Sequence, residues 1–179
     1  MIRPANAADA DGVAAVRRAS WRAAYAGIID SAHIERVTAP NGAAAPPLPH
    51  LTLVVAVAGE RGEVIGYASF GPERLVAVPR PVPAGARLLT DAGMAGQTGE
   101  VYAIYLAPER WSAGVGRALM DTALDGLRAA GYRQVVLWVL TANARARRFY
   151  DKAGFAPDGG VNVLAGLGGV EELRYARDL

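Results

Sequence analysis

In the first part of the chain, apolar residues follow two patterns of spacing, one typical of helices and one typical of strands. Apolar residues recur at helical spacing after Asp9 and predict an amphipathic helix that Gly27 closes. Farther along, two apolar runs flank a glycine-containing turn and predict a β-hairpin. The elements expected here are a strand at 2–3, helices over 9–25 and 31–37, a loop over 39–49, and strands at 51–58 and 64–70.

The second part of the chain alternates strands and helices. A long, proline-rich connection over 71–99 precedes it, in which only 75–78 could pair briefly at a sheet edge. The elements expected afterwards are strands at 100–106 and 135–140, helices over 114–130 and 143–153, and a last strand at 173–176. This order predicts an α/β protein of the α+β type, with one twisted mixed sheet of about six to seven strands and about four helices.

Composition narrows the class of protein. The 179 residues suffice for a single domain over 1–179 with a buried core. There is no cysteine, which excludes disulfides, thiolate nucleophiles and cysteine-ligated metals. The longest apolar run, 51–58, is too short to span a bilayer, and no signal-peptide pattern opens the chain. We therefore expect a cytoplasmic protein with no membrane partner.

The formal charge of +2 is slight. Arg145, Arg147 and Arg148 crowd one segment, which we interpret as the solvated face of a helix rather than a nucleic-acid-binding stripe. His33 and His50 lie far apart in the sequence without ligand-like spacing. We therefore expect neither a nucleic-acid partner nor a metal.

The segment from Glu100 to Gly116 is the first candidate site. It predicts a buried strand, a tight turn, and a Gly-Val-Gly loop that opens a helix. Backbone N–H groups without helical partners gather at such a helix start and can hold a phosphate. The third glycine of a dinucleotide fingerprint is absent, because Leu119 stands there, and the lysine and hydroxyl of a P-loop are absent too.

A second motif runs from Asn143 to Phe155 on the last predicted helix. Asn143 and Tyr150 share a face of that helix, so Asn143 can cap it while Tyr150 looks into the same space. We interpret Phe149 and Phe155 as core aromatics.

Together, these motifs resemble the GNAT superfamily of acyl-CoA-dependent N-acyltransferases, and the likeness covers nearly the whole chain outside 71–99. The loop motif of that family begins with glutamine or arginine, whereas Trp111 stands here, which removes one polar side chain. The resemblance implies a coenzyme A arm threaded between the strands at 100–106 and 135–140. The residues it implies for binding acetyl-CoA or coenzyme A are Ile104, Leu106, Ser112, Ala113, Gly114, Val115, Gly116, Arg117, Asn143 and Tyr150.

The resemblance also implies catalytic roles. The N–H of Ile104 is expected at the thioester carbonyl. Glu100, on a face shared with Tyr102 and Ile104, is the expected base, and partial burial would raise its pKa. The alternative for Glu100 is an exposed carboxylate at a strand end. Tyr150 is the expected general acid, because a phenol is protonated at neutral pH.

The sequence gives the least information about the acceptor. Trp21 and Tyr25 could line its pocket or form a hydrophobic seam against the sheet. We expect a single-domain N-acetyltransferase that acts on a primary amine, in a small molecule or a peptide, and that can form a homodimer. A GNAT-fold module that binds acyl-CoA without catalysis is the alternative. A nucleic-acid-binding protein is a third possibility, which salt-sensitive affinity would reveal.

Overall fold

A computed structural model describes residues 1–39, 50–74 and 97–179. Its strands are β1 (Ile2–Pro4), β2 (Thr52–Ala58), β3 (Glu63–Pro72), β4 (Thr98–Leu106), β5 (Gln134–Leu140), β6 (Ala156–Leu164) and β7 (Val170–Asp178). Its α-helices are α1 (Ala10–Ala24), α2 (Ser31–Thr38), α3 (Val115–Ala129) and α4 (Ala144–Lys152). Short 3-10 helices are η1 (Ala7–Asp9), η2 (Pro108–Arg110) and η3 (Ala165–Leu167).

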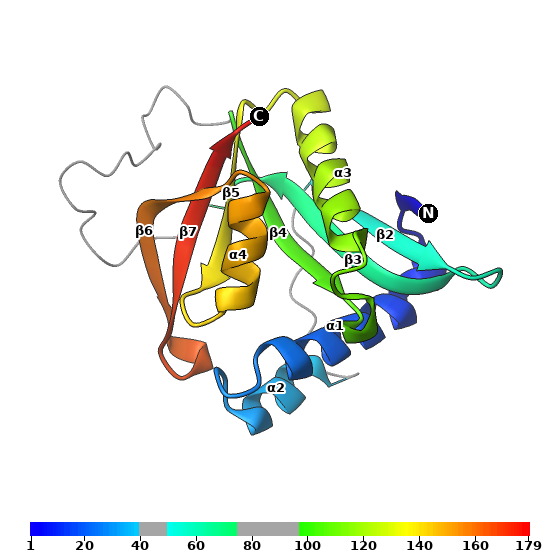
Figure 1. The fold of residues 1–179 in the computed structure, drawn as a ribbon, viewed down its shortest axis with the longest axis horizontal. Helices are drawn as coiled ribbons and strands as arrows, with labels where there is room; N and C mark the ends of the chain where they lie inside the picture. The colour runs from blue at the N-terminus through cyan, green and yellow to red at the C-terminus, as the bar shows by residue number, and fades with distance from the viewer. Residues whose placement is uncertain (40–49, 75–96) are drawn as a thin grey trace.

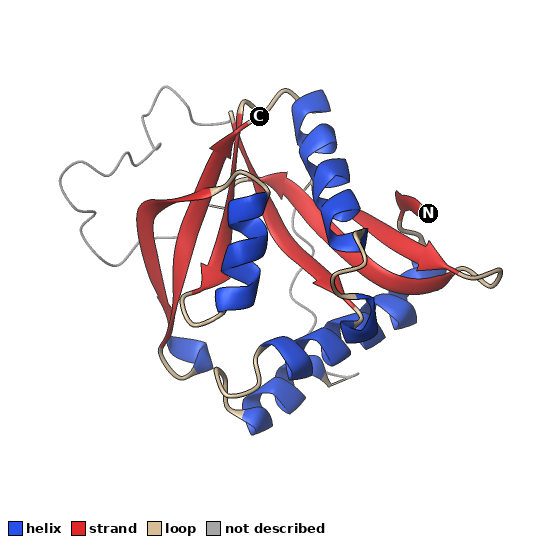
Figure 2. Cartoon of the chain, viewed as in Figure 1, coloured by secondary structure: helices blue, strands red, loops and turns tan. Residues whose placement is uncertain are grey.

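One seven-stranded sheet in the order β1-β2-β3-β4-β5-β7-β6 forms the centre of the molecule. Only the central pair, β4 with β5, is parallel, and every other pair is antiparallel. Helices α3 and α4 cover one face, while α1 and α2 lie on the other, toward the end where β4 and β5 finish (Figure 1). The sheet is therefore mixed, as the sequence predicted, and helices cover both of its faces (Figure 2).

Each face has its own core. Beneath α3 and α4, apolar residues such as Leu119, Leu137 and Tyr175 are almost fully buried in one large cluster. On the other face, Val16 of α1 packs with Val55 and Tyr67. A third, smaller cluster joins α2 to the end of β5. At about 25 cal/mol per Å² of apolar surface, these clusters supply the main force that holds helices to the sheet.

The central strands part soon after they meet. Parallel pairing of β4 with β5 covers only 98–100 against 134–136. Beyond Glu100, β4 stays paired with β3 through Leu106, while β5 stays paired with β7 through Leu140. A gap therefore opens in the middle of the sheet toward the C-terminal ends of both strands.

The predicted elements are confirmed to within one or two residues, apart from the edges of the 71–99 connection and the end of the chain. Strand β3 runs on to Pro72 and β4 begins at Thr98, so both strands reach into that connection. The possible pairing at 75–78, and nearly all of the loop expected over 39–49, lie outside the described residues. Strand β6 was not predicted, and β7 is longer than the strand expected at 173–176.

Candidate active site

A cavity of about 800 Å³ passes through the gap between β4 and β5. Its lining includes Phe149 and Tyr150 from the face that α3 and α4 cover. It also includes Trp21, Tyr25 and Glu172 from the opposite face. Two ligands that enter from opposite faces of the sheet can therefore meet in the gap.

The start of α3 offers unpaired backbone donors to one end of this cavity. The first backbone bond of the helix runs from the N–H of Ala118 to the carbonyl of Gly114 (3.1 Å), so the three preceding N–H groups have no helical partner. Ser112 and Gly114 adopt left-handed conformations, with φ of 64° and 81°. A Cβ added to Gly116 would lie 3.4 Å from Leu106 and 3.5 Å from Phe149. This bare backbone, together with the positive end of the helix dipole, suits an anionic ligand.

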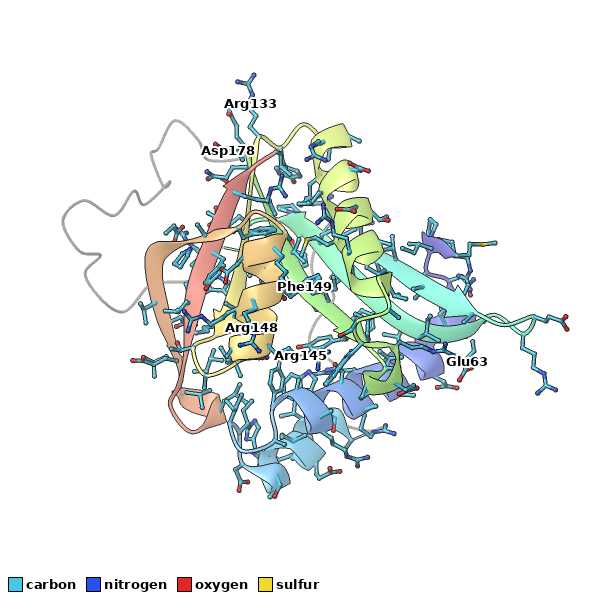
Figure 3. The ribbon with its side chains drawn as sticks, viewed as in Figure 1. Glu63, Arg133, Arg145, Arg148, Phe149 and Asp178 are labelled. Carbon is cyan, nitrogen blue, oxygen red and sulfur yellow. The ribbon has the colours of Figure 1, made fainter. Side chains whose placement is uncertain are left out.

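Trp111 links this loop to α4. Its indole Nε1 donates a hydrogen bond to the carbonyl of Leu106 (3.2 Å). The guanidinium carbon of Arg145 lies 3.9 Å from the centre of the indole. Figure 3 shows Arg145 and Arg148 projecting from α4, and both line the cavity. At this position the loop therefore has an indole in place of a polar side chain, and the indole holds the cationic side chain of Arg145 beside the loop.

Asn143 and Tyr150 line the same cavity. Asn143 caps α4, because its Oδ1 accepts a hydrogen bond from the N–H of Ala146 (3.0 Å). The ring of Tyr150 packs against Phe149 and Phe155. Its hydroxyl has no hydrogen-bond partner among the described residues, and burial raises its pKa. The phenol therefore keeps its proton at neutral pH.

The exposed edge of β4 supplies further main-chain groups. The N–H of Ala107 donates to Ile65 of β3 (3.0 Å). Because alternate residues of a strand point their N–H and C=O groups to opposite edges, Ile104 and Leu106 direct theirs into the gap. An extended ligand in the gap could pair with that edge as a strand does.

Residues 17–155 match the model of the Acetyltransferase (GNAT) family. The chain belongs to this family. It is therefore an acyltransferase, and acetyl-CoA is the acetyl donor that the family uses.

Comparisons with individual proteins agree with this assignment. The N-acetyltransferase YuaI of Bacillus subtilis is 30% identical over 142 residues, which cover 79% of this chain and 72% of that protein. A mycothiol acetyltransferase of Beutenbergia cavernae is 50% identical over 60 residues, but the match spans only 20% of that protein's length. The PaiA N-acetyltransferase of Thermoplasma acidophilum, solved in complex with coenzyme A, has the same fold, with a TM-score of 0.72 at 20% identity over 100% of this chain and 98% of that one.

The cavity fits a GNAT acetyl donor. Free N–H groups at the start of α3 and the basic side chains that line the same end suit the phosphates of coenzyme A. Those basic residues are Arg117, Arg145, Arg148 and Lys152. The edge of β4 that faces the gap suits an amide-bearing arm, although the carbonyl of Leu106 already accepts a hydrogen bond from Trp111.

The structure gives Glu100 surroundings that the sequence did not predict. Its side chain is fully buried (0% exposed), so the alternative of an exposed carboxylate is wrong. Arg74 bonds to both of its oxygens, with Nη2 2.5 Å from Oε1 and the backbone N–H 2.8 Å from Oε2. Arg74 lines the cavity, whereas Glu100 does not. Arg74 therefore takes up the lone pairs that a base would use.

The prediction that Glu100, Tyr102 and Ile104 share one face of β4 is wrong. A bulge lies opposite Ser69 and Phe70, where Ala103 and Val101 are the paired residues and Tyr102 is extra. Glu100 therefore does not share a face with Ile104, which packs beneath α3 and α4.

Trp21 and Tyr25 form a hydrophobic seam and also line the cavity. Their rings are 5.1 Å apart and pack edge to face, as in a hydrophobic seam. Both also line the cavity. The hydroxyl of Tyr25 lies 3.2 Å from that of Tyr105, and burial raises the pKa of both phenols.

Among the cavity residues that sequence reasoning missed are Arg74, Trp138 and Glu172. Arg74 lies in the proline-rich connection after β3, for which the sequence gave no clear secondary-structure signal. Trp138 and Glu172 point to the face opposite α4, because their neighbours Leu137 and Leu173 pack beneath that helix. The apolar run of β5 and the short strand expected at 173–176 gave no signal for either.

No helix in the described ranges is long and apolar enough to cross a membrane. The same ranges contain no group of three or more histidines, cysteines or carboxylates that could hold a metal ion.

Proposed function

We propose that this chain transfers the acetyl group of acetyl-CoA to a primary amine by direct attack in a ternary complex. The observation that carries the proposal is one continuous cavity through the sheet, with phosphate-compatible groups on one side and an aromatic chamber on the other. Absence of cysteine from the chain removes the thiol nucleophile best suited to an acetyl-enzyme route. Direct transfer needs both ligands in one space, and the cavity provides it.

The residues take distinct roles in this proposal. Amides of 112–117 and the basic residues near them hold the phosphates, and main-chain groups of Ile104 and Leu106 align the arm. The N–H of Ile104 steadies negative charge at the carbonyl oxygen; a donor of this kind contributes about 3–4 kcal/mol in other enzymes. Tyr150 holds the proton that the departing sulfur needs. Asn143 fixes the start of α4 and thereby the position of Tyr150.

Glu100 does not enter the proposal as the base that the sequence suggested. Its buried carboxylate is better suited to holding Arg74 at the cavity wall, because both of its oxygens accept hydrogen bonds from that arginine. Replacing the carboxylate would leave the half-buried guanidinium without its counter-charge. We therefore expect Glu100→Gln to disturb the wall and the stability of the protein rather than proton transfer alone.

Thiol release tests the proposal directly. The purified protein is mixed with acetyl-CoA and a library of primary amines, and free coenzyme A is titrated with a thiol reagent; the cysteine-free protein adds no background. A ternary-complex mechanism gives intersecting double-reciprocal plots. Tight binding of coenzyme A without thiol release for any amine would instead identify the non-catalytic module. No affinity for coenzyme A or its thioesters would refute both.

A further inference from the structure

Glu172 is the one carboxylate in the lining of the cavity, as far as the chain is described. It lies on β7, opposite Leu140 of β5 on one side and Asn162 of β6 on the other. The amide of Asn162 donates a hydrogen bond to Oε1 (2.8 Å). Within the described ranges, Oε2 has no hydrogen-bond partner. One oxygen is therefore anchored and the other is open to a ligand.

The two buried or half-buried carboxylates near the gap differ in what they can still do. Glu100 meets Arg74 through both oxygens and lies behind it. Arg74 is 41% exposed and presents its outer side to the cavity. The Arg74–Glu100 pair is neutral as a unit, so Glu172 leaves this end of the cavity with one negative charge.

Aromatic side chains form the walls around that charge. Trp138 lies diagonally across from Glu172 on the same face of the sheet, because Trp138 pairs with Arg174, two residues along β7. Trp21, Tyr25 and Tyr105 close the chamber from α1 and β4. Apolar Ile29, Leu164 and Leu167 complete the lining.

We propose that Glu172 seats the ammonium group of the acceptor and takes its proton, and that the acceptor is a monocationic primary amine with an aromatic or similarly bulky apolar body. This assignment of Glu172 and of the acceptor class rests on the proposed acetyl transfer. A second ammonium on the ligand would meet no second carboxylate among the described lining residues. A carboxylate on the ligand would meet Arg74, whose charge Glu100 neutralises, because the other basic lining residues hold the phosphates of coenzyme A in the proposal. Cation–π contacts with the tryptophans would add to the preference for a single ammonium.

The proton balance of the step is complete. The ammonium gives one proton to the Glu172 carboxylate and becomes a neutral amine with a lone pair. That lone pair forms the C–N bond to the acetyl carbon while the C–S bond breaks. The phenol of Tyr150 protonates the departing sulfur, and the second amine proton returns to Tyr150 through water. Glu172 releases its proton to solvent, so one proton is produced per turnover at neutral pH.

The surroundings of Glu172 suit a base. Burial raises the pKa of Glu172, and the nearby charge of Glu100 raises it further. The hydrogen bond from Asn162 on β6 and the charge of Arg74 act in the opposite direction. A carboxylate with a raised pKa is a stronger base than an ordinary carboxylate.

Phenethylamine is the probe that tests both parts of the proposal. Its binding to the protein saturated with coenzyme A is measured by calorimetry, beside phenylalanine, which adds a carboxylate, and spermidine, which adds ammonium groups. Thiol release from acetyl-CoA is measured with the same amines. Glu172→Gln keeps an oxygen for Asn162 to bond, and Glu171→Gln is the matched control on the same strand, because Glu171 is exposed and outside the cavity lining.

We expect Glu172→Gln to weaken phenethylamine binding about tenfold or more and to lower kcat/KM by about 100-fold or more. Its coenzyme A affinity should stay within twofold of the wild type, which also shows that it folds. The wild-type rate should rise with pH through the raised pKa of Glu172, and this limb should vanish in Glu172→Gln but persist in Glu171→Gln.

Failures of the two proposals are distinguishable. If the wild type binds phenethylamine through Glu172 but never releases thiol, the amine seat stands and acetyl transfer is refuted. If Glu172→Gln acetylates phenethylamine as fast as the wild type, transfer stands and the role of Glu172 is overturned. If phenylalanine or spermidine binds more tightly than phenethylamine, the acceptor class is overturned.

Discussion

The stack of Arg145 on Trp111 makes a quantitative prediction about how coenzyme A is held. Trp111 replaces the polar residue with which the family's loop begins, yet it brings a guanidinium from α4 to within 3.9 Å of its ring centre. We expect this guanidinium to contact a phosphate of the ligand. The perturbations are Trp111→Ala, Arg145→Ala and the double variant.

The magnitudes follow from the contacts. Arg145 is exposed, so its stack on the indole contributes about 0.5–1 kcal/mol. The hydrogen bond from Trp111 to Leu106 contributes about 1 kcal/mol to the shape of the loop. We therefore expect Trp111→Ala to weaken coenzyme A binding about 10-fold, and loss of a charged contact to the ligand in Arg145→Ala to weaken it at least as much. Because the stack positions the charge, the double variant should lose about 0.5–1 kcal/mol less than the sum of the two single variants.

Calorimetric titration with coenzyme A and with 3′-dephospho-coenzyme A provides the assay. If Arg145 meets the 3′-phosphate, its substitution has no effect on the dephosphorylated ligand; if it meets the pyrophosphate, both ligands lose affinity. Arg148 also lines the cavity but is not stacked on Trp111, so Trp111→Ala combined with Arg148→Ala should be additive. Additivity of Trp111→Ala with Arg145→Ala, within about 0.3–0.5 kcal/mol, would refute the reasoning.

Three further predictions concern proton transfer, acid stability and packing. Tyr150→Phe removes the proton donor and should lower kcat by about 100-fold while coenzyme A affinity stays within twofold; an unchanged kcat would exclude Tyr150 as the acid. Hydrogen bonds from Arg3, and from the N–H of Asn6, lower the pKa of Asp9 to about 2. Its contribution to stability is thus present above about pH 4 and lost toward pH 2, so the difference in Tm between wild type and Asp9→Asn should shrink over that range. A Cβ on Gly126 would lie 2.7 Å from the ring of Phe70, so Gly126→Ala should destabilise the protein by about 1–2 kcal/mol in urea unfolding, whereas a gain in stability would show that the ring yields.

The sequence predicted the elements whose signals are local. The spacing on α1 and α3, the hairpin of β2 and β3, and the apolar run of β5 each depend on neighbouring residues. Strand β6 was not predicted because Pro157, Gly159 and Gly160 are typical of turns. In the structure, Gly159 and Gly160 fall in an irregular stretch between the pairs Pro157–Tyr175 and Val161–Leu173. An edge strand tolerates such residues, since only one side must pair.

The same distinction holds within the candidate site. The side of the cavity proposed for acetyl-CoA could be predicted because its groups belong to two continuous motifs, the loop before α3 and the start of α4. The acceptor side is assembled by contacts between strands, one of which, β6, was not predicted. Arg74 reaches Glu100 across 26 positions, and Glu172 meets Asn162 only because β6 and β7 form a hairpin. Spacing along the chain carries no trace of such contacts.

The bulge in β4 explains why one strand can serve both sides of the cavity. A regular strand would place Glu100, Tyr102 and Ile104 on one face. The extra residue at Tyr102 shifts the alternation, so that Tyr105 joins the aromatic chamber while Ile104 and Leu106 pack toward α3 and α4. Before the bulge, β4 and β5 are still paired; after it, the free edge of β4 faces the gap. A single inserted residue therefore coincides with the change from a continuous sheet to a cavity, and it sorts the side chains of β4 between the amine and the acetyl donor.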